Sequence, residues 1–329
     1  MTGSGTQASP YIISTLADLQ ALPALVNEGQ LSKYYAELAN DIDGKYRTEW
    51  ETFSITTTSD FDFDLKGHSI KNFKSTGERK SIFAFNNNSY YTNNASHKMH
   101  NGSILNFKND QNLQFVERGF LVGGQYEDLS ISAYIVKHWR AALDRVRKMD
   151  RCAINFLIDE WYGQNSLGRV MTFQVHGGTA KEICNLSDFK VIIKNICDLS
   201  AAAIRTRGLA IFGQTDAGGN VKVMKNCRLQ GEIQTLANDS LNQYPMISDE
   251  MKLENCVISF GLPAYTGSGT VVDAYAIPVT STGVVNSSLV SDFEHYMFPV
   301  VANMPRLTDA NVRSYIALNA AGFDVELDS

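Results

Sequence analysis

The chain has 329 residues, of which 44% are hydrophobic, and its formal net charge is -6 at pH 7. This length exceeds the usual globular domain, which indicates either two domains or one long unit built from repeats. The acidic balance argues against nucleic acid as a partner, because phosphate recognition needs clustered Lys and Arg. No apolar run reaches the roughly twenty residues that cross a bilayer, and the first residues lack the basic and apolar regions of a signal peptide. We therefore expect synthesis in the cytosol and no insertion into a membrane.

The five cysteines form no C-x-x-C pair, so the sequence signals neither a zinc site nor a redox pair. Three of them recur at steps of 30 and 29 residues. We predict free, buried thiols at all five positions: Cys152, Cys184, Cys197, Cys227 and Cys256.

The first fifty residues predict a cap made of strands and one helix. An apolar stretch at residues 10–13 is typical of a strand. Thr15, followed three residues later by Asp18, matches the capping-box pattern, and leucines at helical spacing come after it. Residues 34–38 predict a second strand, and the Asn and Asp residues that follow favour a tight turn. We assign residues 1–50 to this N-terminal strand and helix cap.

From residue 51 onwards, short β-type runs alternate with Asn, Asp and Gly. Five of the turns begin with Asn or Asp, at steps of 27, 57, 41 and 29 residues: Asn101, Asp128, Asn185, Asn226 and Asn255. A solenoid explains this recurrence, because each coil returns the chain to the same edge and stacks the same residue type on its predecessor. We predict an all-β fold, a single-stranded, right-handed parallel β-helix over residues 51–300. The alternative is that Asn-rich turns recur in any β protein.

Stacked Asn side chains both donate and accept hydrogen bonds, so a column of them can satisfy turn groups along the solenoid. Asn226 and Asn255 form the most regular pair of this predicted turn stack. Cys227 and Cys256 come directly after them, and alternation along a strand then points both thiols into the core.

Two stretches depart from this rhythm. The apolar residues of the first recur at helical spacing, with basic residues on the other faces: Val136, Trp139, Leu143, Val146 and Met149. We predict a helix inserted in the solenoid near residues 136–151, which accounts for the doubled step of 57 residues. Residues 308–322 run from a Thr N-cap to a terminal Gly, and they predict a C-terminal helical cap within residues 301–329.

The N-terminal region resembles the β-helical repeat regions of bacterial surface adhesins and bacteriophage virion proteins, including those with the GLUG repeat. The resemblance covers residues 1 to about 75 and rests on Gly3-Ser4-Gly5-Thr6, Pro10-Tyr11-Ile12-Ile13, Asp18-Leu19-Gln20, Tyr34-Tyr35-Ala36-Glu37-Leu38, Asn40-Asp41-Ile42-Asp43 and Gly67-His68-Ser69-Ile70-Lys71-Asn72. Later repeats lack the Gly-Leu-x-Gly core of that pattern. The resemblance implies display on a virion or a cell surface, a homotrimer, and no catalytic residues.

Paired carboxyl groups are the strongest sign of an enzyme in this sequence. Asp159 and Glu160 are candidates for the acid and the base or nucleophile of a glycosidase, which need to lie about 5–10 Å apart. The aromatic residues Trp161 and Tyr162 lie beside this pair and can stack on sugars. The alternative is a solvated pair at a strand end, which we favour.

Asp60, Asp62 and Asp64 alternate with apolar residues, so the three carboxylates face one side of a strand, where hard oxygen ligands can hold Ca²⁺. We favour the alternative, an ordinary strand with its apolar side inward and its acidic side outward. His97 and His100 lie too far from further ligands along the sequence to predict a zinc site, and we expect them in a surface loop.

A loop that contains Tyr90, Tyr91 and several Asn residues is rich in groups that give adaptable recognition, and it is a candidate for contact with a glycan or protein. The sequence shows neither a Ser-His-Asp constellation nor a nucleotide-binding motif, and we predict no cofactor. The leading hypothesis is a non-enzymatic bacteriophage virion protein that binds the host surface or neighbouring virion proteins. The alternatives are a glycan-cleaving tailspike and a secreted cell-surface adhesin.

Overall fold

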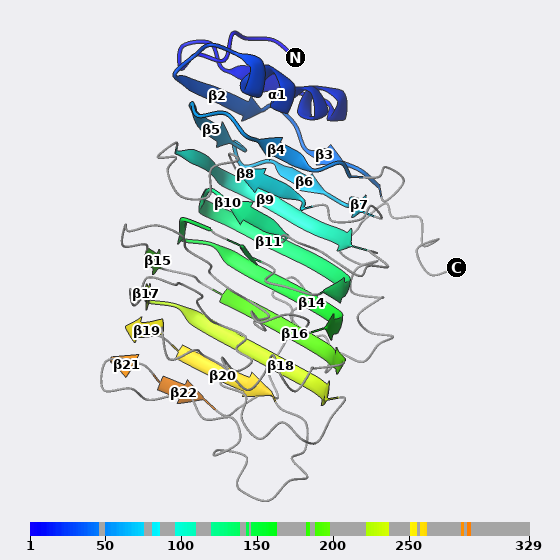
Figure 1. Cartoon of the computed structure of the whole chain (residues 1–329), viewed down its shortest axis with the longest axis vertical. Coiled ribbons are helices and arrows are strands. Elements are labelled where there is room, and N and C mark those ends of the chain that lie inside the picture. Colours follow the sequence, from blue (N-terminus) through cyan, green and yellow to red (C-terminus); the bar gives the residue numbers. More distant parts are fainter. Residues whose placement is uncertain are drawn as a thin grey trace, which may run out of the picture.

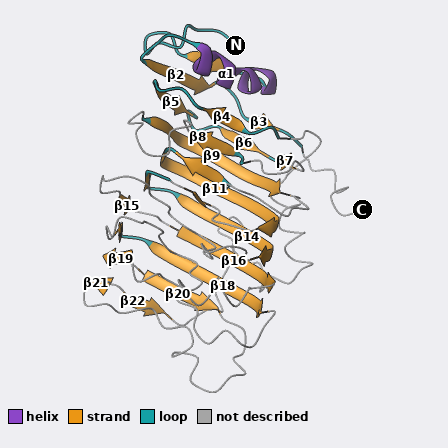
Figure 2. Cartoon of the chain, viewed as in Figure 1, coloured by secondary structure: helices purple, strands orange, loops and turns teal. Residues whose placement is uncertain are grey.

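The structure, a computed structural model, is a parallel β-solenoid whose strands stack along the long axis of an elongated molecule (Figure 1). The helix lies at the N-terminal end of the stack, and strands make up most of the remaining described chain (Figure 2). The structure describes residues 1–45, 50–75, 81–85, 96–109, 120–138, 143–144, 146–162, 182–184, 188–197, 222–236, 251–254, 257–261, 284–285 and 288–290. Within these ranges, no helix is both long and apolar enough to span a bilayer. The predicted all-β, parallel β-helical fold is confirmed.

The described strands fall into a large sheet and a small sheet, and the one described helix is α1 (Leu16–Glu28). The large sheet holds β1 (Tyr11–Ile13), β2 (Lys33–Leu38), β3 (Ile42–Asp43), β5 (Asp60–Asp64), β6 (Ser69–Lys71), β7 (Lys74–Ser75), β9 (His97–Asn109), β11 (Gln125–His138), β13 (Lys148–Asp150), β14 (Ala153–Tyr162), β15 (Glu182–Cys184), β16 (Asp188–Cys197), β17 (Lys222–Lys225), β18 (Arg228–Leu236), β19 (Met251–Glu254), β20 (Val257–Gly261), β21 (Val284–Val285) and β22 (Ser288–Val290). The small sheet holds β4 (Phe53–Ile55), β8 (Phe83–Phe85), β10 (Leu121–Gly123) and β12 (Leu143–Asp144).

In three described coils the chain passes through the small sheet and then enters the large one, since β8 precedes β9, β10 precedes β11 and β12 precedes β13. Successive coils pair in parallel, so one position of a coil lies beside the equivalent position of the next, as Met99 does beside Tyr126. Parallel pairing thereby arranges side chains of one kind in rows along the axis of the solenoid.

The predicted N-terminal cap has the local contacts that its sequence pattern requires. Thr15 Oγ1 accepts a hydrogen bond from the backbone N of Asp18 at 3.2 Å, and Asp18 Oδ2 accepts one from the backbone N of Thr15 at 3.0 Å. This reciprocal pair satisfies two backbone donors at the start of α1. Leu19, Leu22 and Val26 of the helix are buried.

The core follows from alternation along the strands. In β5 the outward carboxylates alternate with Phe61 and Phe63, both fully buried. Aromatic rings from successive coils then meet inside the solenoid, where Trp50 lies 4.7 Å from Phe73 and 5.1 Å from Phe107 between ring centroids. Full burial of such side chains stabilises the fold by about 1.5–3 kcal/mol each.

Left-handed backbone conformations recur along the large sheet, within β9 and β11 and between β17 and β18. Asn101, Asp128 and Asn226 have φ values of 60°, 52° and 53°. Short polar side chains tolerate this conformation because they bond locally to the backbone. Asn185 and Asn255, the other predicted members, lie outside the described residues, as do residues 301–329 with their predicted helical cap.

Arg151 has the same conformation, with φ 51°, and it follows Asp128 by 23 residues. The step of 57 residues between Asp128 and Asn185 therefore contains a further turn of the solenoid. The predicted helix near residues 136–151 is wrong, because β11 continues to His138 and β12 and β13 follow. Leu143, Val146 and Met149 are buried, but Leu143 and Met149 enter the core from the short strands β12 and β13. These strands pair with neighbouring coils, and this pairing overrides the helical spacing.

One row inside the solenoid consists of buried polar groups. Asn72 Nδ2 donates to Asp43 Oδ1 at 3.0 Å, and Asn106 Nδ2 donates to Asn72 Oδ1 at 3.1 Å. Ser132 ends this ladder by accepting a hydrogen bond from the backbone N of Asn106 at 2.9 Å. Asn72 and Asn106 both have positive φ, which bends the backbone at these two positions. Ser132 has no positive φ and β11 continues through it, so the bend is absent from the next coil. The amide-to-amide bond predicted for the outer turn stack is found in this inner ladder.

Candidate functional site

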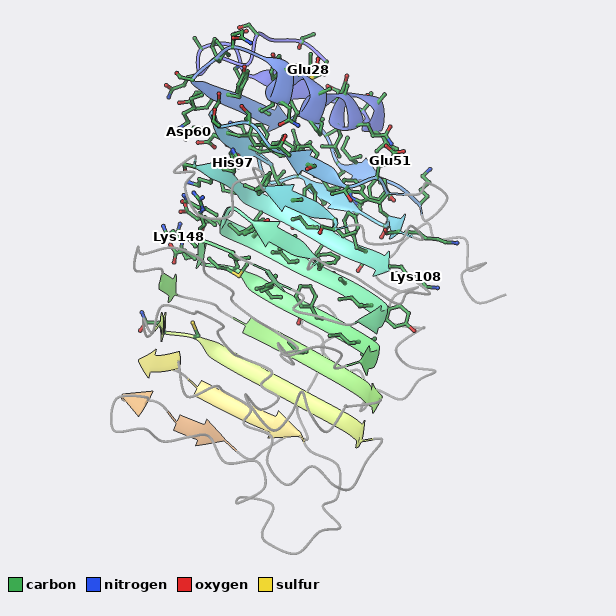
Figure 3. All side chains as sticks on the ribbon, in the orientation of Figure 1. Glu28, Glu51, Asp60, His97, Lys108 and Lys148 are labelled. Carbon is green, nitrogen blue, oxygen red and sulfur yellow. The ribbon has the colours of Figure 1, made fainter. Side chains whose placement is uncertain are left out.

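Outward charged side chains run from coil to coil across β2, β5, β9, β11 and β13. We call this surface the charged face and define it by Lys33, Asp62, Lys98, His100, Glu127 and Lys148. The strand register brings these residues together, because Lys98 pairs with Asp62 on one side and with Gln125 on the other. In Figure 3 the labelled Asp60, His97 and Lys148 lie along one edge of the stacked strands, and Lys108 lies at the opposite edge.

Asp62 is the centre of the first group on the charged face. Nε2 of His100 lies 2.8 Å from Asp62 Oδ1, and Nζ of Lys33 lies 3.6 Å from Asp62 Oδ2. Burial opposes the charged form of Asp62, but the hydrogen bond from His100 and the charges of His100, Lys33 and Lys98 outweigh it and lower the pKa of this carboxyl. Asp62 is therefore an anion that ties β2, β5 and β9 together.

Glu127 is the centre of the second group. Its carboxylate accepts hydrogen bonds from Lys98 Nζ at 2.7 Å and from Lys148 Nζ at 2.8 Å. Burial disfavours the charged form of Glu127, but the two ammonium groups favour it more strongly and lower the pKa of this carboxyl. One carboxylate thus joins β9, β11 and β13.

A third ion pair joins Arg151 to Asp128. Arg151 Nε and Nη2 donate to the two carboxylate oxygens of Asp128 at 2.6 and 2.8 Å, and Arg151 also contacts Asp150. The hydrogen bonds from Arg151 lower the pKa of Asp128. This two-pronged geometry fixes the relative position of two adjacent coils.

The three aspartates of β5 face one side, as the sequence indicates, but each bonds to different groups. Asp60 Oδ1 accepts from the backbone N of Ser96 at 2.7 Å, and Asp64 Oδ1 accepts from the backbone N of Lys66 at 2.7 Å and from Asn101 Nδ2 at 3.0 Å. Together with the bonds of Asp62, these contacts place the carboxylates in separate networks. In the part of the chain that the structure describes, no group of His, Cys, Asp and Glu is arranged to hold a metal ion.

The two histidines expected in a surface loop lie instead in β9. His100 is on the charged face, whereas His97 points inward and is only 4% exposed. Nε2 of His97 lies 3.0 Å from the carbonyl oxygen of Ser59, and burial lowers the pKa of its imidazole. The expectation of a loop was wrong because the pairing of β5 with β9 places both residues in a strand.

The proposed glycan-cleaving pair, Asp159 and Glu160, and the aromatic residues Trp161 and Tyr162 occupy the last positions of β14, and their side chains lie outside the described part of the structure. Tyr90 and Tyr91 fall outside the described residues.

The structure describes the side chains of two cysteines, Cys152 and Cys227. Both are buried and form no disulfide, as predicted. Burial raises the pKa of Cys152 to about 12, so its thiol stays protonated at neutral pH and is a poor nucleophile.

The sequence pattern did not reveal the charged face, because its partners are far apart along the chain. Lys148 and Glu127 are separated by 21 residues, and His100 and Asp62 by 38. The only local signal was the alternation of Asp60, Asp62 and Asp64, which gives the side on which they lie but not their partners.

Comparisons with known protein families give no match to this chain. Curated proteins give none either. Among solved structures, the chain is similar to a candidate immunoglobulin A1 protease from Bacteroides ovatus, with 16% sequence identity, a TM-score of 0.50, and coverage of 88% of this chain and 86% of that chain. At this identity the similarity shows a shared β-solenoid fold and nothing about activity.

Proposed function

We propose that this chain is a non-enzymatic attachment and display protein of a bacteriophage particle, serving as a receptor-binding tail fibre or tip, or as a capsid or tail decoration. The observation that carries the proposal is the pairing of charged side chains from coil to coil. Acid–base catalysis and cation binding need such groups aimed at a ligand. Asp62, His100 and Glu127 instead hold neighbouring coils together, which suits an elongated scaffold.

The resemblance of residues 1 to about 75 to GLUG-like repeats supports display on the surface of a virion, with assembly in the host cytoplasm. The proposal includes neighbouring virion proteins and a host glycan or protein as partners. The experiment is to purify particles from the native host and to locate the chain by immunogold labelling. Labelling on particles is expected, and labelling confined to the bacterial envelope would overturn the virion assignment.

A homotrimer is part of the same proposal, since solenoids of the resembling families are commonly trimers. The chain has a mass of 36.4 kDa, so light scattering at micromolar concentration is expected to give three times that value. A monomeric mass would count against this part of the proposal.

A secreted bacterial surface adhesin is the second candidate, because the resemblance of residues 1 to about 75 covers the repeats of surface adhesins as well as those of virion proteins. Release from its native cell without particles would support it.

Glycan cleavage by a tailspike is tested by measuring reducing sugars from host capsule, with Asp159→Asn and Glu160→Gln as the matched variants. Cleavage that both substitutions abolish would overturn the non-enzymatic proposal, as would cleavage of immunoglobulin A1 by the purified chain.

A further inference from the structure

Two histidines of β9 lie on opposite faces of the same strand, at its junction with β5. His97 pairs with Phe61 and points into the core, and His100 pairs with Asp64 on the charged face. The junction is also held by backbone hydrogen bonds from Phe61 N to Ser96 O and from Leu65 N to His100 O, both at 2.9 Å. A change at either imidazole therefore acts on the same contact between two coils.

The surroundings of His97 as a whole favour its neutral form, because burial of the ring outweighs the backbone hydrogen bonds of Ser59 and Thr57 and the charge of Asp60, which favour the imidazolium. The ring lies 6.1 Å from the ring of Phe85 between centroids, and its Nε2 lies against the carbonyl oxygen of Ser59. Two charged groups act on the His97 imidazole. They are Asp60, the first residue of β5, and the half-buried Arg147 from the segment before β13. Asp60 already accepts a backbone hydrogen bond from Ser96, and Arg147 repels a second positive charge.

The outward side of the junction is held by His100. Its Nε2 lies 2.8 Å from Oδ1 of Asp62 on β5, and Asp128 of β11 is a further carboxylate within electrostatic range. The contact between His100 and Asp62 joins two coils, and both side chains are about a fifth exposed, at 22% and 23%. Lys33 and Lys98 share Asp62, so this contact belongs to a wider network.

We propose that the β5–β9 junction is an acid-sensitive clasp, in which protonation of the inward His97 opens the junction and the outward pair of His100 with Asp62 opposes the opening. Neutral His97 is accommodated in the core, whereas the imidazolium is stable only when the junction opens to water. The outward pair sets how acidic the medium has to be before that happens.

The direction of the pH dependence follows from the lowered pKa of His97. The open state binds this proton more tightly than the closed state, so the closed junction is fully stable above the ordinary pKa of about 6.5. Its stability is lost as the pH falls from there through the lowered value. The population of the open state rises about tenfold for each pH unit crossed in this interval.

The test is hydrogen–deuterium exchange by mass spectrometry on the full chain between about pH 7.5 and pH 4.5, corrected for the intrinsic exchange rate. Peptides that cover residues 60–65 and 96–101 are expected to lose protection below about pH 6.5 in the wild type. His97→Gln is expected to flatten this response, and His100→Gln to shift its onset to higher pH. Glu28→Gln, a change at an exposed position of α1 outside β5 and β9, is the control and is expected to leave the onset unchanged.

If peptides of His97→Gln lose exchange protection with the same pH profile as those of the wild type, the proposal is overturned. An unchanged onset in His100→Gln would remove the outward pair from the clasp. If His97→Gln does not fold, the titration of His97 in the wild type by NMR decides the matter. A protonation midpoint below about 6.5 that coincides with loss of protection supports the clasp, and a normal midpoint with protection intact overturns it.

Discussion

At Asn101 the backbone is left-handed, with φ 60°, and the side-chain amide donates to Asp64 Oδ1 at 3.0 Å. A residue with a Cβ and no local hydrogen bond adopts this conformation at a cost of about 1–2 kcal/mol, which glycine avoids. We expect Asn101→Ala to lower the free energy of unfolding by about that amount, and Asn101→Gly by clearly less, in urea titrations. Equal losses in the two variants would show that the hydrogen bond to Asp64, and not the backbone conformation, selects Asn.

Ser132 and Ser130 are two positions apart in β11, and only Ser132 belongs to the buried polar ladder. Ser132 is 6% exposed and accepts a hydrogen bond from the backbone N of Asn106, whereas Ser130 is exposed. We expect Ser132→Ala to cost about 1–3 kcal/mol of unfolding free energy, because it leaves a buried donor of Asn106 without its partner. Ser130→Ala is the matched control and is expected to stay within about 0.5 kcal/mol. Comparable effects in the two variants would contradict a stabilising role for the ladder.

At the scale of the elements, Glu127 joins three strands, β9, β11 and β13, through Lys98 and Lys148. Exposed ion pairs contribute about 0.2–1 kcal/mol each, so we expect Glu127→Gln to destabilise the chain by about 1 kcal/mol at pH 7. Glu37→Gln is the control, since Glu37 is more exposed and lies 3.8 Å from its nearest ammonium group, that of Lys66.

The same variant has a defined pH dependence. The pKa of Glu127 is lowered on folding, so its contribution is complete above the ordinary value of about 4.5 and is lost as the pH falls through the lowered folded value. We expect the difference in melting temperature between wild type and Glu127→Gln to shrink towards zero at acidic pH. A difference that persists below the folded pKa would show that Gln disturbs packing and not charge.

At the scale of the whole molecule, an aromatic core connects coils that are distant in the sequence. The fully buried Phe83 lies 5.4 Å from Trp50 and 5.5 Å from Phe53 between ring centroids. We expect Phe83→Ala to cost about 3–5 kcal/mol, because it removes a large buried ring and leaves a cavity. Leu25→Ala changes a residue of α1 that is 42% exposed and is expected to have little effect. Denaturant unfolding followed by near-ultraviolet circular dichroism measures both, and a loss below about 1 kcal/mol for Phe83→Ala would indicate that the core repacks.

Individual strands and turns differ in how far the sequence predicted them. The alternating pattern of β5 and the capping box at Thr15 and Asp18 require only neighbouring residues, and the structure has both. The stretch that contains β12 and β13 was mistaken for a helix, because short apolar runs fit a helical spacing as well as a strand spacing until their partners are known.

The sequence by itself determined the parallel β-solenoid and the residue types at its turns, because alternation, capping and left-handed backbone conformations are local properties of the chain. Only the tertiary structure decided which coils lie side by side. The structure contains a further turn at Arg151 that the sequence did not predict. Its amide-to-amide hydrogen bond joins Asn72 and Asn106 and not the predicted outer turns. His100 contacts Asp62 across 38 residues. The reason is that register between coils depends on loop lengths and on packing of the shared core, and neither is encoded in any one segment.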